Sequence, residues 1–318
     1  MFSSILNQMI FLFALIVIGF ILSKWRFVPE NASQTLSKME NILFVPALVM
    51  GTFIDNFTVS SLSAMWKIFV LGLATVFFFI AVSLVVARIC YKEKYLQKIA
   101  TYGLAFSNFG FMGNAIMKAV FPTIFTEYVV FTLPFWFMIY MWGAPVLLIS
   151  GSNDGQKVSL KQRLRSFANP MLIGMFIGMI IGLTGLKLPK GIHSVITVSG
   201  NCMSPIAMLL TGMVIGKTDV LKLLTRWRLY LTSAMKLVVY PAIMLLILAV
   251  LPVNGFFTVT FLKCAACVAC MPMGLNTIVI PAAYGKDTTD AAGLALVSHL
   301  FSVGTIPLTF MLLQNLIL

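Results

Sequence analysis

The sequence predicts an all-α membrane protein with ten transmembrane helices, arranged as two inverted five-helix repeats. Three observations support this fold class: the composition, the spacing of the apolar segments, and residues that recur at matching places in the two halves. Of the 318 residues, 60% are hydrophobic and 10% are charged, whereas a soluble domain carries about 25% charged residues. With a mean hydropathy of +1.01, the chain is expected to have the lipid bilayer as a partner.

Ten apolar segments are long enough to cross a bilayer, for which a helix needs about 20 mostly apolar residues. No basic residue precedes the first segment and no cleavage pattern follows it, so a retained helix is expected rather than a signal peptide. The predicted spans cover residues 5–24, 38–55, 66–88, 97–120, 126–149, 168–186, 194–216, 229–251, 256–283 and 291–316.

The excess of basic residues predicts the orientation of the chain. Lysine and arginine outnumber aspartate and glutamate by 22 to 9, and most of them lie in one set of alternate loops. Because such loops face the cytoplasm, the pattern predicts a plasma-membrane protein with both termini outside the cytoplasm. A nucleic-acid partner is not expected, because no basic stripe with interleaved aromatic residues lies outside the apolar segments.

The two halves of the chain share a register. Pro46 and Pro205 recur at nearly the same separation as Asn114 and Asn276. Five spans per half is an odd number, so the second half would enter the membrane from the opposite side, as in many secondary transporters. The predicted organisation is a first repeat over residues 1–150, a cytoplasmic loop over 151–166 and a second repeat over 167–318.

Two of the spans contain residues that disfavour a continuous helix. In the ninth span, Pro272 lacks an amide donor, Gly274 loosens the backbone, and Asn276 is a preferred helix N-cap. The chain is expected to break there, at 271–276, and at 108–114 in the fourth span. Both breaks would lie near the middle of the membrane, where irregular backbone must be buried in protein or line a cavity.

These breaks predict an anion site. The second half-helices would start at Asn114 and Asn276, and each start exposes unpaired N–H groups with about half a positive charge. Two such ends that face each other would suit a carboxylate. Capping of the half-helices alone is the alternative role of the two asparagines. The predicted substrate-binding residues at the breaks are Asn108, Gly110, Gly113, Asn114, Pro272, Gly274 and Asn276.

Further polar side chains within the spans complete the predicted site. Ser302 and Thr305 follow Ser298 on one face of the tenth span, although their hydroxyls could instead bond to their own helix. Tyr140 lies at the place in the fifth span that matches Ser302. Lys236 would either attract an anion or extend to the membrane interface. None of the nine acidic residues is expected clearly in mid-span, which disfavours a pure cation antiporter.

No metal, cofactor or catalytic group is expected. Cys264, Cys267 and Cys270 recur at every third residue, a spacing that a thiolate metal site could use, but small residues packing between helices explain it better. No span combines a nucleophile, a base and an acid, so an enzyme is not expected. His299 is expected to be a packed neutral side chain, with no partner that can be named.

Several motifs resemble those of the auxin efflux carrier family. They are Met271-Pro272-Met273-Gly274-Leu275-Asn276, Tyr284-Gly285, Asp290-Ala291-Ala292 and Ser302-Val303-Gly304-Thr305-Ile306-Pro307. The resemblance covers essentially the whole chain. Bacterial members of this family are often named malate or malonate permeases, and the plant PIN auxin exporters are similar in core architecture. Gly110 stands where a proline is usual in the plant members.

The resemblance implies a fold like that of bile-acid transporters and proton antiporters. Spans one, two, six and seven would form a scaffold and a homodimer interface, and the other six would form a mobile transport domain around crossing broken helices four and nine. The expected function is secondary transport of a small mono- or dicarboxylate by alternating access, with proton or sodium coupling left open. A sodium-coupled bile-acid-type symporter and a non-transporting membrane sensor or scaffold are the alternatives.

Overall fold

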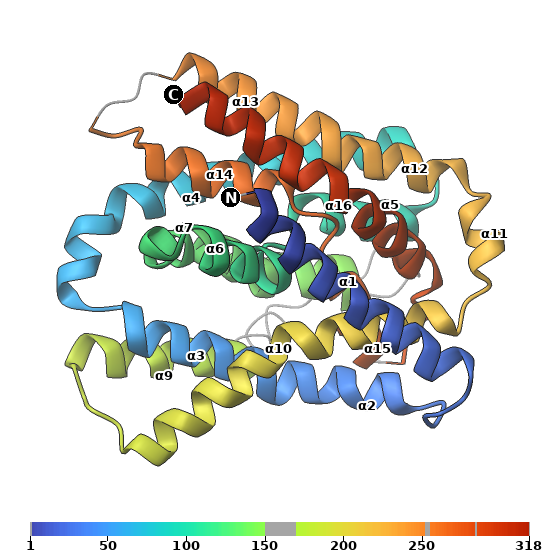
Figure 1. Cartoon of the computed structure of the whole chain (residues 1–318), viewed down its shortest axis with the longest axis horizontal. Coiled ribbons are helices and arrows are strands. Elements are labelled where there is room, and N and C mark those ends of the chain that lie inside the picture. Colours follow the sequence, from blue (N-terminus) through green and yellow to red (C-terminus); the bar gives the residue numbers. More distant parts are fainter. Residues whose placement is uncertain (1, 150–169, 252–254, 284, 318) are drawn as a thin grey trace.

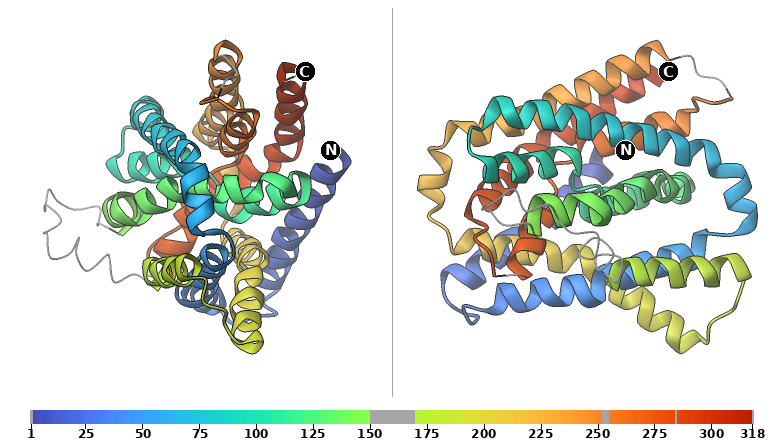
Figure 2. Two further views of the ribbon diagram at one scale, coloured as in Figure 1. Left: turned by 90° about the vertical axis from the view of Figure 1, so that its left-hand side faces the viewer. Right: turned by 180° about the vertical axis from the view of Figure 1, so that it is seen from behind.

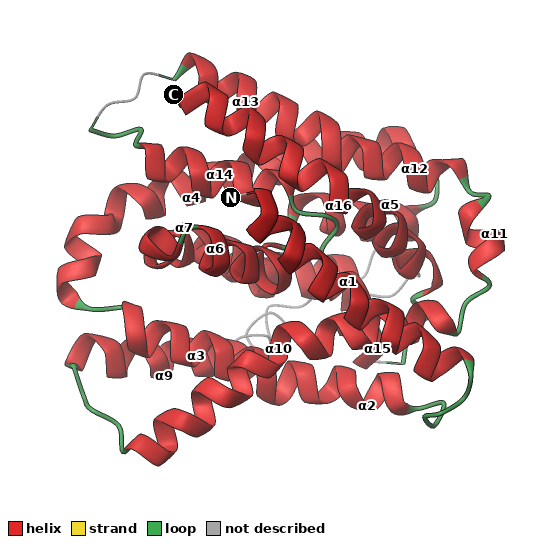
Figure 3. Ribbon diagram, viewed as in Figure 1, coloured by secondary structure: helices red, strands yellow, loops and turns green. Residues whose placement is uncertain are grey.

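The computed structural model describes the whole chain except residues 1, 150–169, 252–254, 284 and 318. The described part is helical, and it contains no strand (Figure 3). The predicted cytoplasmic loop 151–166 lies outside the described residues. All-helical structure is the fold class that the composition predicts, because in lipid a helix satisfies its backbone hydrogen bonds within one segment.

The first half of the chain contains both long helices and short helical pieces (Figure 1). Several of the pieces are single π-helical or 3₁₀ turns that continue a neighbouring helix. In chain order they are α1 (Phe2–Lys24), α2 (Ala32–Met39), η1 (Glu40–Phe44), α3 (Val45–Asn56), α4 (Val59–Cys90), α5 (Lys94–Ala105), η2 (Phe109–Gly113), α6 (Asn114–Val120), η3 (Pro122–Ile124), α7 (Phe125–Met138) and η4 (Ile139–Ile149).

The second half also combines long helices with short helical pieces. Its elements are α9 (Pro170–Thr184), α10 (Lys190–Gly216), α11 (Val220–Leu224), α12 (Trp227–Ala234), η5 (Met235–Val239), α13 (Tyr240–Val250), α14 (Val259–Cys270), α15 (Asn276–Ala283) and α16 (Thr289–Ile317). Seen from behind, the long helix α4 runs across the length of the molecule (Figure 2).

Seven helical stretches of the described chain are long and apolar enough to cross a membrane, so the protein is a multi-pass membrane protein. They are Ile5–Lys24, Ala32–Asn56, Met65–Cys90, Pro122–Ile149, Lys190–Gly216, Trp227–Val250 and Thr289–Leu316. The other three predicted spans are the short helix α9 and the two interrupted segments α5–η2–α6 and α14–α15. Ten spans in an inverted repeat stay a prediction.

Close contacts through glycines hold one group of helices together. A side chain at Gly212 of α10 would overlap the Ile16 carbonyl oxygen of α1, and one at Gly178 of α9 would overlap the Met50 carbonyl oxygen of α3. Small residues allow such approaches, which favour helix association in lipid. The helices α1, α3, α9 and α10 therefore form one packed group.

A second group contains the interrupted segments. Helix α4 packs against α5 and α7, α12 and α14 pack against α16, and α13 packs against α14. In Figure 1, α2, α3, α9 and α10 occupy the lower part of the molecule, α1 runs diagonally from the middle to the lower right, and most of the second group lies above. The two groups meet along α1, α2 and α10 on one side and α6, α15 and α16 on the other.

Candidate functional site

The two interrupted segments cross each other in the interior. Helix α5 ends at Ala105 and α14 ends at Cys270, and neither segment is helical over the next few residues. At the crossing the Asn108 amide donates to the Pro272 carbonyl oxygen at 2.8 Å. The Ser107 hydroxyl donates to the Val268 carbonyl oxygen, also at 2.8 Å. The two segments therefore provide hydrogen-bond partners for each other's backbone groups, and buried backbone groups require such partners.

Gly274 allows this close approach. A Cβ atom at this position would overlap the Phe106 carbonyl oxygen. The glycine is needed here for space between two backbones, because any side chain would push the segments apart. The predicted break in the ninth span is thus confirmed, and α15 begins at Asn276 as expected.

The first break lies at the N-terminal edge of the predicted segment. The chain is irregular at Phe106–Asn108 and becomes helical again at Phe109, where the π-helical turn η2 leads directly into α6. The Asn108 side chain caps this start by accepting the Met112 amide at 3.3 Å. Helix α6 begins at Asn114 as predicted, but the π-helical turn before it was not predicted.

Helix α16 forms hydrogen bonds with residues of both breaks. The Asn108 side-chain amide lies 2.9 Å from His299 Nε2, and His299 Nδ1 lies 2.8 Å from the Ala295 carbonyl oxygen. A carbonyl only accepts, so Nδ1 carries the proton and Nε2 accepts from the amide. The preceding residue of α16, Ser298, accepts the Met273 amide through its hydroxyl at 3.3 Å. His299 is buried, as expected, but its partner was not predicted.

A cleft of about 280 Å³, lined by both apolar and polar side chains, lies between the two groups of helices, beside the first break. Its buried part includes Gly110 and Phe111, in the first turn of the resumed helix, and Asn114 and Lys118 follow on the same side of α6. The opposite wall comes from α1, α3 and α10. Residues that line it there include Gln8, Thr52, Asp55, Asn56, Thr197, Asn201 and Ser204. We refer to this space as the Asn114 cleft.

A comparison with known protein families identifies the family of this chain. A family model for membrane transport proteins matches residues 4–310 of the chain. The chain belongs to the auxin efflux carrier family. This is a family of membrane transporters and not of enzymes. A search of the curated proteins finds no match.

The remaining predicted residues at the breaks of this carrier lie in its packed interior. Asn276 is 7% exposed and lies beside the Tyr102 hydroxyl. Tyr140 is buried and stacks on Trp136, with ring centroids 6.5 Å apart. Gly113 lies under Tyr128, and a Cβ there would overlap the Tyr128 hydroxyl. The structure thus brings Gly110 and Asn114 to the cleft but keeps Asn276, Tyr140 and Gly113 outside its described lining.

Ser302 and Thr305, on the polar face of α16, differ in their hydrogen bonding. The Ser302 hydroxyl donates to the His299 carbonyl oxygen at 2.7 Å, which is the bond to its own helix that the sequence left open. Thr305 differs, because its buried hydroxyl oxygen has no hydrogen-bond partner among the described residues. Neither residue belongs to the described lining of the Asn114 cleft.

Lys236 is buried within the second group of helices. Its amine has no hydrogen-bond partner in the described chain and lies 5.2 Å from the Phe79 ring centre and 4.9 Å from that of Tyr240. Such contacts stabilise an ammonium group through the face of the ring. The lysine does not extend to the surface, and it does not contribute to the described lining of the cleft.

One acidic residue lies deeper in a helix and in the protein than the sequence indicates. Glu40 lies within the apolar stretch Ala32–Asn56, where it is fully buried. Neither of its carboxylate oxygens has a hydrogen-bond partner among the described residues. The sequence prediction failed because it started the second span at residue 38, whereas the helix starts at Ala32. Glu40 therefore lies two turns further into the helix than expected.

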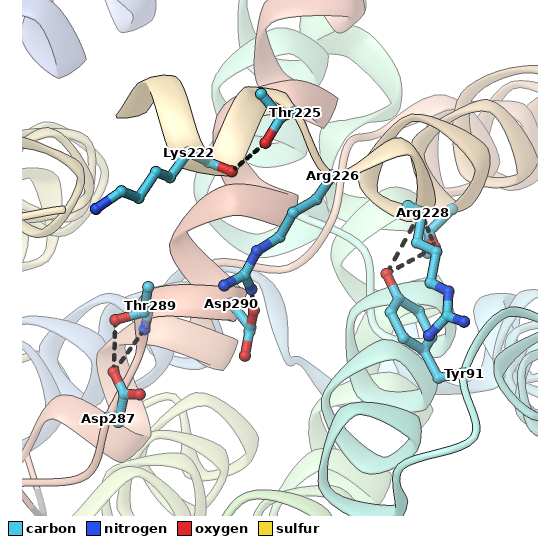
Figure 4. A network of polar contacts seen from close by, with 9 residues as sticks. Tyr91, Lys222, Thr225, Arg226, Arg228, Asp287, Thr289 and Asp290 are labelled. Carbon is cyan, nitrogen blue, oxygen red and sulfur yellow. Dashed lines mark hydrogen bonds and ion pairs between the residues drawn. The ribbon is translucent and has the colours of Figure 1, made fainter. Parts of the chain in front are cut away.

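A polar network joins the start of α12 to the start of α16 (Figure 4). Arg226 forms an ion pair with Asp290, and the Tyr91 hydroxyl donates to the Arg228 carbonyl oxygen at 3.4 Å. Asp287 accepts the Thr289 amide at 2.9 Å and the Thr289 hydroxyl at 2.6 Å. These hydrogen bonds hold the pKa of Asp287 below its usual value. The ion pair links the start of α12 to the start of α16, the helix that forms hydrogen bonds with both breaks.

The cysteines and other metal-binding side chains form no cluster that could hold a metal ion in the described part of the chain. Cys264, Cys267 and Cys270 are buried in α14 as free thiols. Their small side chains pack in the interior of the second group, close to the crossing.

Proposed function

We propose that this carrier transports a small organic anion, a mono- or dicarboxylate such as malate or malonate, and that the Asn114 cleft is its binding site. The observation that carries this proposal is the position of the cleft at the first turn of a resumed helix. The first N–H groups of a helix lack partners within it and carry partial positive charge. Gly110 and Phe111 belong to that turn and line the cleft.

The chemistry of the lining supports an anion. Asn114 and Asn201 offer amide donors, and Lys118 adds a positive charge one turn beyond Asn114. The acidic residue at the rim, Asp55, is engaged by His193, whose Nε2 lies 2.9 Å from Asp55 Oδ1. A volume of about 280 Å³ is at the low end of ligand pockets, which hold drug-sized molecules in about 300–1,000 Å³. A small carboxylate fits this size.

Alternating access would follow from movement of the second group of helices past the first. We propose that α1–α3, α9 and α10 form a scaffold and a homodimer interface, and that α4–α7 and α12–α16 form the transport domain of an inverted repeat. The cleft has one wall from each group, so a sliding movement would carry Asn114 and the substrate away from Asn201. The Ser204 hydroxyl, which donates to the Phe111 carbonyl oxygen at 2.7 Å, would have to change partners.

The orientation is also a proposal. The basic residues of alternate loops favour a plasma-membrane location with both termini outside the cytoplasm. Lys118 and Asp55 would then lie toward the outer side, and the cleft would be open outward in this conformation. Asn276, Tyr140, Lys236, Ser302 and Thr305 would contribute to binding in another conformation, since none lines the described cleft here.

Counterflow in proteoliposomes tests this function. Purified protein should exchange labelled malate or malonate with unlabelled anion in a saturable manner. Asn114→Ala should lower the exchange at limiting substrate at least about tenfold, which corresponds to about 1.4 kcal/mol of lost binding. Asn31→Ala is the matched control, because the Asn31 side chain lies in an exposed turn and makes no capping hydrogen bond. If Asn114→Ala and Asn276→Ala both exchange like the wild type, the site is assigned incorrectly.

The same proteoliposomes distinguish the proposed carrier from the two alternative functions. A sodium-coupled symporter would require a sodium gradient for accumulation of the anion. A sensor or scaffold would bind the anion in detergent but show no flux in vesicles.

A further inference from the structure

Glu40 is a buried acid without a partner in the described structure. It is the first residue of the π-helical turn η1, which connects α2 to α3. The side chain is 0% exposed, and both carboxylate oxygens lack a hydrogen-bond partner among the described residues. Burial of an ionised carboxylate without a partner costs several kcal/mol. The neutral, protonated acid is therefore the form that this conformation accommodates.

Among the described residues, no cation is seen to interact with Glu40. The elements packed against η1 are α2, α3, α9, α10 and α15, and two of them, α9 and α15, carry no titratable side chain. The Tyr140 hydroxyl on η4 is the titratable group that interacts electrostatically with Glu40. Lys38 is exposed on α2, and the ion pair of Asp55 with His193 lies at the far end of α3. The other titratable side chains on these elements are Lys190 and Cys202.

Glu40 lies at the boundary between the two groups of helices. Three residues before it, the Ser37 hydroxyl donates to the Val279 carbonyl oxygen of α15. One residue after it, the Asn41 side-chain amide donates to the Ser37 carbonyl oxygen at 2.8 Å and lies 3.5 Å from the Val279 carbonyl oxygen. Residues three and four apart share a helix face, so Ser37, Glu40 and Asn41 form one polar face against α15. Movement of α15 along α2 would uncover this face.

We propose that Glu40 is a proton-binding site that takes up a proton when α15 and η4 cover it and releases the proton to water when they move away. The step is the simple equilibrium between a carboxylate with a free proton and the neutral acid, and it needs no other reactant. It rests on the proposed transport cycle and adds the coupling ion to it. A sodium ion would need several oxygen ligands around it, and a sodium dependence of exchange, tested below, distinguishes it from a proton.

The pH dependence of exchange in proteoliposomes tests this assignment. Wild-type exchange should change with pH, by up to about tenfold per pH unit on one side of the profile, as expected for a single linked proton. Glu40→Gln keeps the shape and the neutrality of the acid, so it should still exchange anion but with a flat profile. Glu40→Asp should retain a pH dependence. Glu93→Gln is the matched control, since Glu93 is exposed and caps no helix through its side chain.

Several results would overturn the role of Glu40. One is a Glu40→Gln profile that coincides with that of the wild type. Another is a Glu40→Gln variant that keeps its pH profile but loses a sodium dependence. If the wild type shows no exchange at any pH, the proposed transport function fails, and infrared spectroscopy of the purified protein still decides the protonation. A carbonyl stretching band of a neutral carboxylic acid should be present near neutral pH and missing in Glu40→Gln. Its absence from the wild type would contradict the proton site.

Discussion

At the scale of single residues, Asn108 makes three hydrogen bonds that hold the crossing together. Its backbone amide binds Pro272, its side-chain oxygen caps the resumed helix at Met112, and its side-chain amide binds His299. Each of these groups is buried, so an unsatisfied partner would be costly. The position of the first break follows from this residue rather than from the glycines after it.

Replacement of Asn108 by alanine should lower the stability of the carrier. The change removes a cap and leaves His299 Nε2 without a donor, with an expected loss of about 1–3 kcal/mol. Thermal unfolding of the purified protein in detergent measures this, with Asn31→Ala as the control at an exposed, non-capping asparagine. An Asn108→Ala protein that melts at the wild-type temperature would show that these hydrogen bonds do not stabilise the crossing.

At the scale of elements, the crossing depends on the close approach of two backbones. Gly274→Ala places a methyl group against the Phe106 carbonyl oxygen, where no flexible side chain can move aside. Overpacking of this kind costs about 1–3 kcal/mol or more, and it should also reduce anion exchange because the breaks separate. Gly304→Ala in α16 is the control, since no described atom lies within 4 Å of its added Cβ.

Unfolding and exchange assays on these two variants check the prediction together. Gly304→Ala should match the wild type in both. Gly274→Ala with wild-type exchange would mean that the close approach is unnecessary for transport.

Much of this element-level structure could be predicted from sequence, and the failures have identifiable causes. The cluster of Pro272, Gly274 and Asn276 marked the second break because each residue disfavours a helix locally. The first break has no proline, and Asn108 is held there by His299, which is distant in sequence and therefore invisible to local patterns. Glu40 was misplaced because the polar start of α2 reads as a loop, although Ser37 is buried against α15.

At the scale of the whole molecule, the family membership identifies a transporter. The Asn114 cleft takes one wall from each group of helices, and Glu40 lies on the same boundary against α15. We propose that the substrate and the mechanism depend on this boundary. We expect an anion in the cleft and a proton at Glu40 to bias the same movement.

Whether the anion binds in the Asn114 cleft is tested most directly by substrate protection of a cysteine placed there. Ala115 lines the cleft next to Asn114, whereas Ala119 is exposed one turn later on α6 and outside the described lining. Each would be changed to cysteine in a Cys202→Ser background, because Cys202 is the one native cysteine that is not buried. Labelling by a membrane-impermeant thiol reagent is then measured with and without malate or malonate.

Malate or malonate should slow labelling of Ala115→Cys and leave labelling of Ala119→Cys unchanged. A neutral sugar or an organic cation should protect neither position. Equal labelling of Ala115→Cys with and without carboxylates, at concentrations that saturate counterflow, would contradict the placement of the anion in the Asn114 cleft.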